Sequence, residues 1–182
     1  MKTLYLLRHA KSAWDDPSLH DHDRPLAPRG KKAAPLIGRH LRDRKARVDL
    51  ALCSTARRAR QTCDRVLAEM GDGKPPVELE RRLYLCGASA LLERLHAVPD
   101  SVAALMLVAH NPDLHELALR LIGGGNQAMR ASLAEKFPTA AYTILTFDTA
   151  RWSDLAEGSG MLVDFVRPRD LTFAGPASRD PA

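Results

Sequence analysis

The sequence predicts a three-layer α/β/α protein in which helices cover both faces of a mostly parallel central sheet of about six strands. Short apolar runs alternate with segments of helical periodicity along most of the chain, which is the pattern of βαβ units. The length of 182 residues and the hydrophobic content of 45% suit one domain with its own core. No repeat or Ser/Gly-rich linker divides the chain. We therefore expect a single domain over residues 1–168, followed by a flexible tail over residues 169–182.

Six apolar runs have the length and composition of strands. They cover Thr3–Leu7, Asp49–Cys53, Val77–Leu79, Ala104–Ala109, Ala141–Phe147 and Met161–Val166. No helix of comparable strength separates the last two runs. We therefore expect these two strands to pair antiparallel at an edge of the sheet.

Four segments between or after these strands have helical periodicity. They cover Lys31–Arg44, Ala56–Met70, Ala88–Val98 and Pro112–Ile122. Two of the helices carry start signals. Ser54 is predicted to cap the second helix. Asn111 is predicted to cap the fourth, with Pro112 at its first position and Asp113 in its first turn.

The charge balance favours anionic partners. The chain has 27 Lys and Arg against 22 Asp and Glu, a net charge of +5, so the protein attracts anions. The basic residues between Arg39 and Arg47 gather near the end of a predicted helix, where cations complement the helix dipole. No aromatic side chains are interleaved with them to stack on bases. We expect a phosphorylated partner and no nucleic acid.

The remaining composition excludes several other classes. The longest stretch without charge, Ser101–Pro112, is too short to span a membrane, and the N-terminus lacks the features of a secretory signal. The three cysteines, Cys53, Cys63 and Cys86, have no C-x-x-C spacing. We expect a cytoplasmic monomer without membrane contact, disulfide, metal or cofactor.

Polar residues follow three of the predicted strands. Arg8 and His9 follow the first strand, Arg57 and Arg58 come shortly after the second, and His110 follows the fourth. Each alone is more commonly a polar loop or helix-surface residue, but the carboxyl ends of parallel strands meet where ligands bind. Arginine binds phosphate oxygens in a bidentate manner, and a neutral imidazole can attack phosphorus. The combination predicts a phosphoryl-transfer site.

Three segments resemble the histidine phosphatase (phosphoglycerate mutase-like) superfamily. Leu6–Ser12 resembles its R-H-[GA] signature, Ser54–Thr62 its S-x-x-x-R-A-x-Q-T segment, and Val108–Pro112 its H-N-P segment. Shorter matches resemble the SixA-like phosphohistidine phosphatase branch and lie at Asp21–Leu26, Arg29–Gly30, Leu83–Tyr84 and Phe165–Pro168. The resemblance spans nearly the whole chain and implies a phosphoglycerate mutase-like fold.

The resemblance also implies a role for each site residue. His9 would be the nucleophile that becomes phosphorylated, with Arg8 and Arg58 binding phosphate oxygens. His110 would contact the phosphoryl group and stabilise charge in the transition state. Arg57 does not align with the family's arginine, and helical periodicity alone does not separate it from Arg58.

One family residue is missing. Mutase-like relatives keep a Glu after the third strand as proton donor, whereas Leu83–Gly87 has no carboxylate. Asp21, Asp23 and Glu80 are alternatives, and the sequence does not choose among them. Hydrolysis of an alkyl phosphate needs a positioned acid to protonate the leaving oxygen. The leaving group of phosphohistidine is a ring nitrogen, and that ring can carry its own proton.

The sequence therefore favours a metal-independent phosphatase that acts on phosphohistidine in a protein. Two alternatives remain: a phosphatase of small phosphate esters, which would use the same four residues, and a non-catalytic phosphate-binding regulator.

Overall fold

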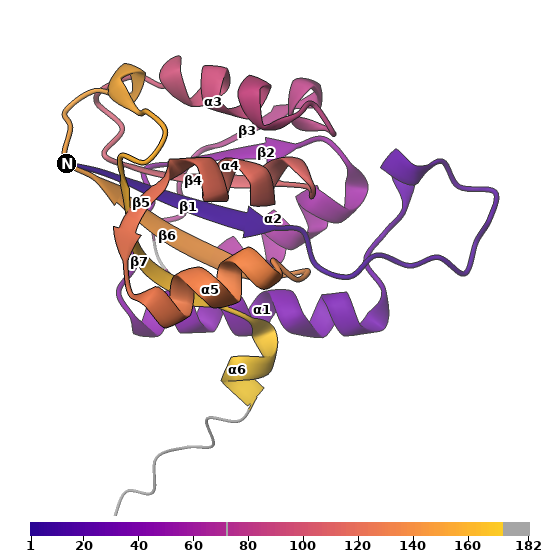
Figure 1. Ribbon diagram of the computed structural model, residues 1–182. Coiled ribbons are helices and arrows are strands. Elements are labelled where there is room, and N and C mark those ends of the chain that lie inside the picture. The colour runs from indigo at the N-terminus through magenta and orange to yellow at the C-terminus, as the bar shows by residue number, and fades with distance from the viewer. Residues whose placement is uncertain (72, 173–182) are drawn as a thin grey trace, which may run out of the picture.

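The computed structural model describes residues 1–71 and 73–172, which form a seven-stranded sheet with helices on both faces (Figure 1). The strands are β1 (Lys2–Arg8), β2 (Leu50–Ser54), β3 (Val77–Glu80), β4 (Ala104–Ala109), β5 (Ile122–Gly125), β6 (Tyr142–Phe147) and β7 (Gly160–Val166). Their order in the sheet is β3-β2-β4-β1-β6-β7-β5. The predicted α/β class and mostly parallel sheet are confirmed.

Four neighbouring strands, β3, β2, β4 and β1, pair in parallel. β6 runs antiparallel to both β1 and β7. The predicted antiparallel pairing of Ala141–Phe147 with Met161–Val166 is thus confirmed. Their predicted position at the edge is wrong, because β5 pairs in parallel with β7 and lies outside it. β5 has the sequence IGGG, which lacks strand propensity. A Cβ on Gly123 would lie 1.7 Å from the carbonyl oxygen of Gly158, so close backbone contact requires glycine there.

The helices are α1 (Pro28–Asp43), α2 (Arg57–Glu69), α3 (Ala88–His96), α4 (Asp113–Leu121), α5 (Gln127–Glu135) and α6 (Pro168–Thr172). The first four match the predicted helices, whereas α5 and α6 were not predicted. Asn126 caps α5 by accepting a hydrogen bond from the Met129 backbone. α6 includes the first residues of the segment predicted as a tail, and residues 173–182 of that segment lie outside the described residues.

The predicted cap of α2 is wrong. Ser54 is the last residue of β2, and Ala56 occupies the N-cap position of α2. The Ser54 hydroxyl accepts a hydrogen bond from the Ala56 backbone at 3.3 Å and lies 2.8 Å from Nε2 of His110. The Ser54 side chain therefore connects the end of β2 to the residue that follows β4 (Ala104–Ala109), and it does not cap α2.

The predicted cap of α4 is also wrong. Pro112 is the N-cap residue, and no side chain caps this helix. The peptide bond from Asn111 to Pro112 is cis, and Nδ2 of Asn111 donates to the carbonyl oxygen of Phe137 at 3.0 Å. This side chain holds the segment before β6 instead of the helix start.

Two apolar cores lie on opposite faces of the sheet, and β1 contributes alternate side chains to each. Leu4 and Leu6 pack in the core under α3 and α4, whereas Tyr5 and Leu7 pack in the core under α1 and α2. All three cysteines are free thiols. Among the described residues, no helix is both long enough and apolar enough to cross a membrane.

Candidate active site

The site lies at the carboxyl ends of β1, β2 and β4, three neighbours in the sheet. The register pairs Arg8 with Ala109, so the residues that follow them, His9 and His110, are adjacent across the sheet. Their ring centroids are 5.0 Å apart. Parallel pairing thus unites residues that are about one hundred positions apart in the sequence, as the strand-end pattern predicted.

His9 has the protonation state of a nucleophile. Its side chain is only 8% exposed, and Nδ1 lies 2.8 Å from the carbonyl oxygen of Ala10. Because a carbonyl only accepts hydrogen bonds, Nδ1 carries the ring hydrogen and the lone pair is on Nε2. Burial, with a contribution from the charges of Arg58 and Arg8, lowers the pKa of His9 to about 4. The imidazole is therefore neutral at pH 7.

Arg58 lies in the first turn of α2 and contacts His9. Its Nε donates to Nε2 of His9 at 3.4 Å, and its side chain is buried, whereas Arg57 is exposed. Arg58 also donates to the carboxylate of Asp21 at 2.8 Å and to the backbone carbonyl of that residue. The structure thus brings Arg58 into the site and leaves Arg57 out of it.

Asp21 enters the site from the long segment between β1 and α1. Tyr84 donates its hydroxyl hydrogen to Oδ2 of Asp21 at 2.5 Å, and Arg58 donates to the same oxygen. Burial opposes ionisation, but these hydrogen bonds outweigh it and lower the pKa of Asp21. Asp21 is therefore an ionised partner that orients Arg58.

The other two candidate acids do not reach this cluster. Glu80 accepts hydrogen bonds from Arg94 at 2.8 Å and from Arg82. Asp23 is exposed and lies beside His22, 3.3 Å from its Nδ1. Neither carboxylate contacts His9, Arg58 or His110.

His110 is a buried neighbour of His9 in the site. It is 1% exposed, and burial, with a contribution from His9 and Arg58, lowers its pKa to about 3. Nε2 lies 2.8 Å from Oγ of Ser54, whose oxygen already accepts from the backbone. A serine hydroxyl has one hydrogen and two acceptor lone pairs, so this contact is compatible with either neutral tautomer of His110. Nδ1 is buried and has no hydrogen-bond partner among the described residues.

Arg8 also holds an unsatisfied donor. One terminal nitrogen donates to the carbonyl oxygen of Phe137 at 2.8 Å, while Nε is buried without a partner among the residues that the structure describes. Burial and the positive charge of Arg58 lower the pKa of Arg8. A buried unpaired donor is costly. Arg8 Nε and Nδ1 of His110 are thus two buried nitrogens near His9 that have no partner among the described residues.

Sequence reasoning did not find the Ser54 or Tyr84 contributions. Ser54 was interpreted as a helix cap, and its contact with His110 depends on strand register. Tyr84 lies in a matched segment but gave no chemical signal of its own. Its ring packs edge-on against His110, with centroids 5.2 Å apart. Both are tertiary contacts that local sequence patterns do not encode.

A family model described as the histidine phosphatase superfamily, branch 1, matches residues 4–84, which include His9 and Arg58. A protein of Mycobacterium tuberculosis whose function is uncharacterized is 42% identical over 165 residues, covering 90% of this chain and 100% of its own. The chain belongs to the histidine phosphatase superfamily. It is a hydrolase of this superfamily, with the phosphoglycerate mutase-like fold that the resemblance implied.

Solved structures support the same assignment. A protein from Agrobacterium tumefaciens, provisionally named phosphohistidine phosphatase SixA, is 32% identical with a TM-score of 0.77, over 92% of this chain and 98% of its own. A protein with the same provisional name from Nakamurella multipartitia is 30% identical with a TM-score of 0.78, over 92% of this chain and 96% of its own. This histidine phosphatase superfamily member is thus similar to SixA-type proteins over nearly its whole length.

The low imidazole pKa values predict a pH-dependent stability. Unfolded histidines take up protons below about pH 6.5, whereas folded His9 and His110 do so only below pKa values of about 4 and 3. The unfolded state therefore binds more protons in this window, and the free energy of unfolding falls as the pH is lowered from 6.5 to 4. The slope should reach about 1.4 kcal/mol per pH unit for each imidazole.

Urea unfolding at closely spaced pH values measures this slope. A His9→Gln variant should lose the contribution of one imidazole, so its free energy of unfolding should fall less steeply between pH 6.5 and 4. A wild-type slope identical to that of His9→Gln would show that His9 titrates normally in the folded protein.

Proposed function

We propose that the protein is a phosphatase that removes phosphate from phosphohistidine on a protein through a phosphorylated His9 intermediate. The observation that carries this proposal is the state of His9, which is neutral with its lone pair on Nε2 beside the guanidinium of Arg58. This is the form of imidazole that attacks phosphorus. SixA-type relatives support the choice of substrate.

Two steps account for the reaction. In the first, the Nε2 lone pair of His9 attacks phosphorus, and the bond from phosphorus to the substrate nitrogen breaks. The electron pair of that bond returns to the substrate ring, which leaves as neutral imidazole because its second nitrogen carries a hydrogen. In the second, water attacks the phosphoryl group on His9, the bond to Nε2 breaks, and dihydrogen phosphate and neutral His9 are released.

The other site residues stabilise phosphoryl oxygens. Arg8 and Arg58 supply positive charge, and His110, whose ring centroid lies 5.0 Å from that of His9, contacts the phosphoryl group. Asp21 and Tyr84 fix Arg58 from the opposite side. Neither step requires protonation of the leaving group by the protein, in accord with an Asp21 carboxylate whose pKa is lowered.

The choice between P–N and P–O substrates is tested by leaving-group dependence. We expect kcat/KM to be at least about a hundredfold higher for a phosphohistidine peptide than for the phosphoserine peptide of the same sequence, because an alkoxide leaves poorly without an acid. Aryl phosphates should fall between them, and sugar phosphates should lie near background. The measurement is inorganic phosphate release at neutral pH.

An Asp21→Asn variant makes this test more specific. If Asp21 only orients Arg58, the substitution should lower the rates for phosphohistidine and aryl phosphate by a similar factor. A flat leaving-group series, or a loss in Asp21→Asn confined to alkyl esters, would establish a competent acid and favour a phosphatase of small metabolites.

We also expect catalysis to be independent of metal ions. Arg8 and Arg58 already supply the positive charge that a divalent cation would provide at the phosphoryl oxygens. Activity toward a phosphohistidine peptide should be unchanged after incubation with EDTA and desalting. Loss of activity that Mg²⁺ or Zn²⁺ restores would contradict this prediction.

A further inference from the structure

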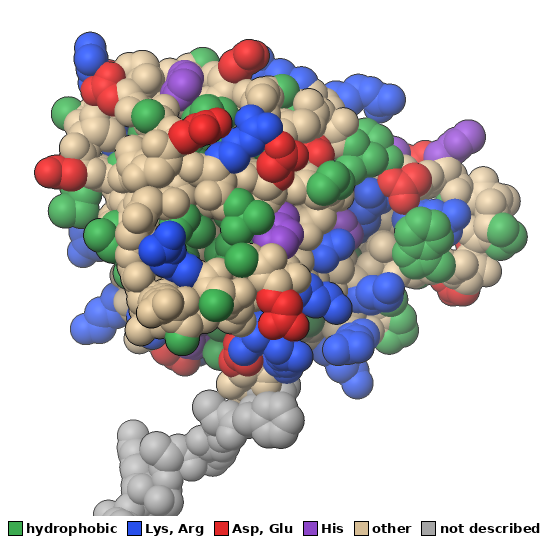
Figure 2. Space-filling model, viewed as in Figure 1, with side chains coloured by type: hydrophobic (Ala, Val, Ile, Leu, Met, Phe, Trp, Pro, Cys, Tyr) green, Lys and Arg blue, Asp and Glu red, His purple; other side chains and the backbone are tan. Residues whose placement is uncertain are grey.

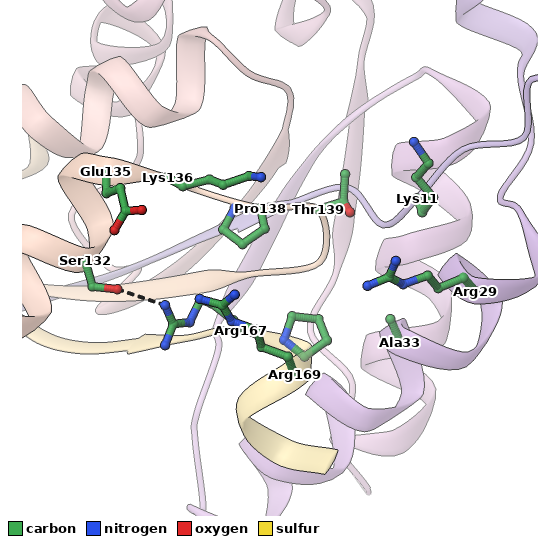
Figure 3. Close-up of a pocket in the computed structure, with 11 residues that line it drawn as sticks. Lys11, Arg29, Ala33, Ser132, Glu135, Lys136, Pro138, Thr139, Arg167 and Arg169 are labelled. Atoms are coloured by element: carbon green, nitrogen blue, oxygen red, sulfur yellow. Dashed lines mark hydrogen bonds between the residues drawn. The ribbon is translucent and has the colours of Figure 1, made fainter. Parts of the chain in front are cut away.

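A basic cavity of about 340 Å³ lies beside the active site, between the segment after β1, the start of α1, the end of α5 and the start of α6 (Figure 3). Five cationic side chains and one carboxylate, that of Glu135, line it together with smaller residues. The cations are Lys11, Arg29, Lys136, Arg167 and Arg169. Lys and Arg side chains also gather on this part of the surface in Figure 2.

The walls of the basic cavity are continuous with the backbone that holds the catalytic residues. Lys11 follows His9 by two residues, so their Cα atoms are at most about 7 Å apart. Lys136 precedes Phe137, whose carbonyl oxygen accepts the hydrogen bond of Arg8 at 2.8 Å. The backbone nitrogen of Ala140 donates to the carbonyl of His9 at 3.1 Å. The backbone segments that line the basic cavity are therefore bonded directly to the segment that bears Arg8 and His9.

The start of α1 is fixed against the segment that bears Lys11. The Ala27 backbone donates to the Lys11 carbonyl at 2.9 Å. A Cβ on Gly30 would lie 2.3 Å from that oxygen, so only glycine permits this approach. The contact places Arg29 and Lys11 on one rim of the basic cavity, with the Arg29 guanidinium directed inward (Figure 3).

Three cations of the basic cavity have no partner in the part of the chain that the structure describes. Arg167 bonds to Asp170 at 2.9 Å and to Ser132, whereas the side chains of Lys11, Arg29 and Lys136 have no ion pair or hydrogen bond within residues 1–71 and 73–172. Glu135 is the one carboxylate among the described residues that line the cavity. Unpaired cations around one cavity attract a diffusible anion or an anionic partner.

We propose that the basic cavity binds Asp or Glu side chains of the substrate protein that lie next to its phosphohistidine, an inference that rests on the proposed function. The cations come from four chain segments and surround a cavity much larger than one phosphate group. Lys11, Arg29 and Lys136 are exposed and on flexible side chains. Such spread and mobile charges suit several carboxylates of an acidic protein surface better than one compact anion.

The test compares two phosphohistidine peptides that differ only in whether the residues around histidine are Asp and Glu or Asn and Gln. At low salt, the wild-type enzyme should cleave the acidic peptide with about tenfold higher kcat/KM, through a lower KM, and added NaCl should reduce this preference. In Arg29→Gln/Lys136→Gln, the preference should disappear, while hydrolysis of the small substrate phosphoramidate should stay within about twofold of wild type.

Arg47→Gln/Lys74→Gln is the matched control. It removes the same charge from exposed residues that precede β2 and β3, at the end of these strands away from the active site. This variant should keep the preference for the acidic peptide, which separates a local site from general attraction by the net charge.

The outcomes separate the two proposals. Equal cleavage of the two phosphohistidine peptides by the wild type, or a preference that persists in Arg29→Gln/Lys136→Gln, would overturn the basic cavity proposal alone. Cleavage of neither phosphohistidine peptide faster than its phosphoserine counterpart would overturn the proposed function and this inference with it.

Discussion

Replacement of His9 by Ala is expected to lower kcat by at least about a thousandfold, because no other side chain presents a lone pair in the same position. His9 is fixed by the Ala10 carbonyl and faces Arg58, so the loss removes the atom that accepts the phosphoryl group. The measurement is steady-state phosphate release from a phosphohistidine peptide and from an aryl phosphate.

Added imidazole provides a further readout for His9→Ala. The substitution leaves a space beside Arg58, and a small imidazole that enters it should restore part of the activity toward the aryl phosphate. Far-UV circular dichroism and thermal unfolding establish that the variant is folded. A folded His9→Ala protein with more than a few per cent of wild-type activity would show that another residue is the nucleophile.

Replacement of Arg58 by Ala is expected to lower kcat/KM by about a hundredfold to a thousandfold, the loss typical of one transition-state charge contact. Arg58→Lys should recover little of this, because the guanidinium fork contacts both His9 and Asp21. Phosphate release across a range of substrate concentrations gives kcat and KM separately.

Arg57→Ala is the matched control for Arg58→Ala. The two arginines are adjacent in the first turn of α2, but Arg57 is exposed and lines a different depression with Arg60 and Asp64. Arg57→Ala should therefore retain activity within about twofold of wild type. Equal losses in the two variants would contradict the assignment of Arg58.

The strand-end residues could be predicted because their positions follow from local patterns. Apolar runs fixed where β1, β2 and β4 end, and parallel pairing then required Arg8, His9 and His110 to meet at one edge. Arg58 could not be separated from Arg57 by periodicity. The choice came from the family resemblance, and it is consistent with the burial of Arg58.

Other features depend on contacts that the local sequence does not show. Asp21 reaches Arg58 and Tyr84 across 37 and 63 positions of sequence, and which carboxylate would do so could not be deduced from composition. β5 escaped prediction because its glycines serve a close approach to Gly158, which opposes the usual preference for bulky strand residues. The predicted caps at Ser54 and Asn111 were wrong because both side chains form tertiary contacts instead. Ser54 contacts His110, and Asn111 donates to the Phe137 carbonyl.

The phosphorylated His9 intermediate is tested most directly by trapping the enzyme during turnover of a phosphohistidine peptide, with rapid quenching into alkali followed by digestion and mass spectrometry. We expect a single phosphoryl group on the peptide that contains His9, stable in alkali, labile in acid, and absent from His9→Ala. A phosphoryl group on any other residue, or turnover without a phosphorylated enzyme at any quench time, would contradict it.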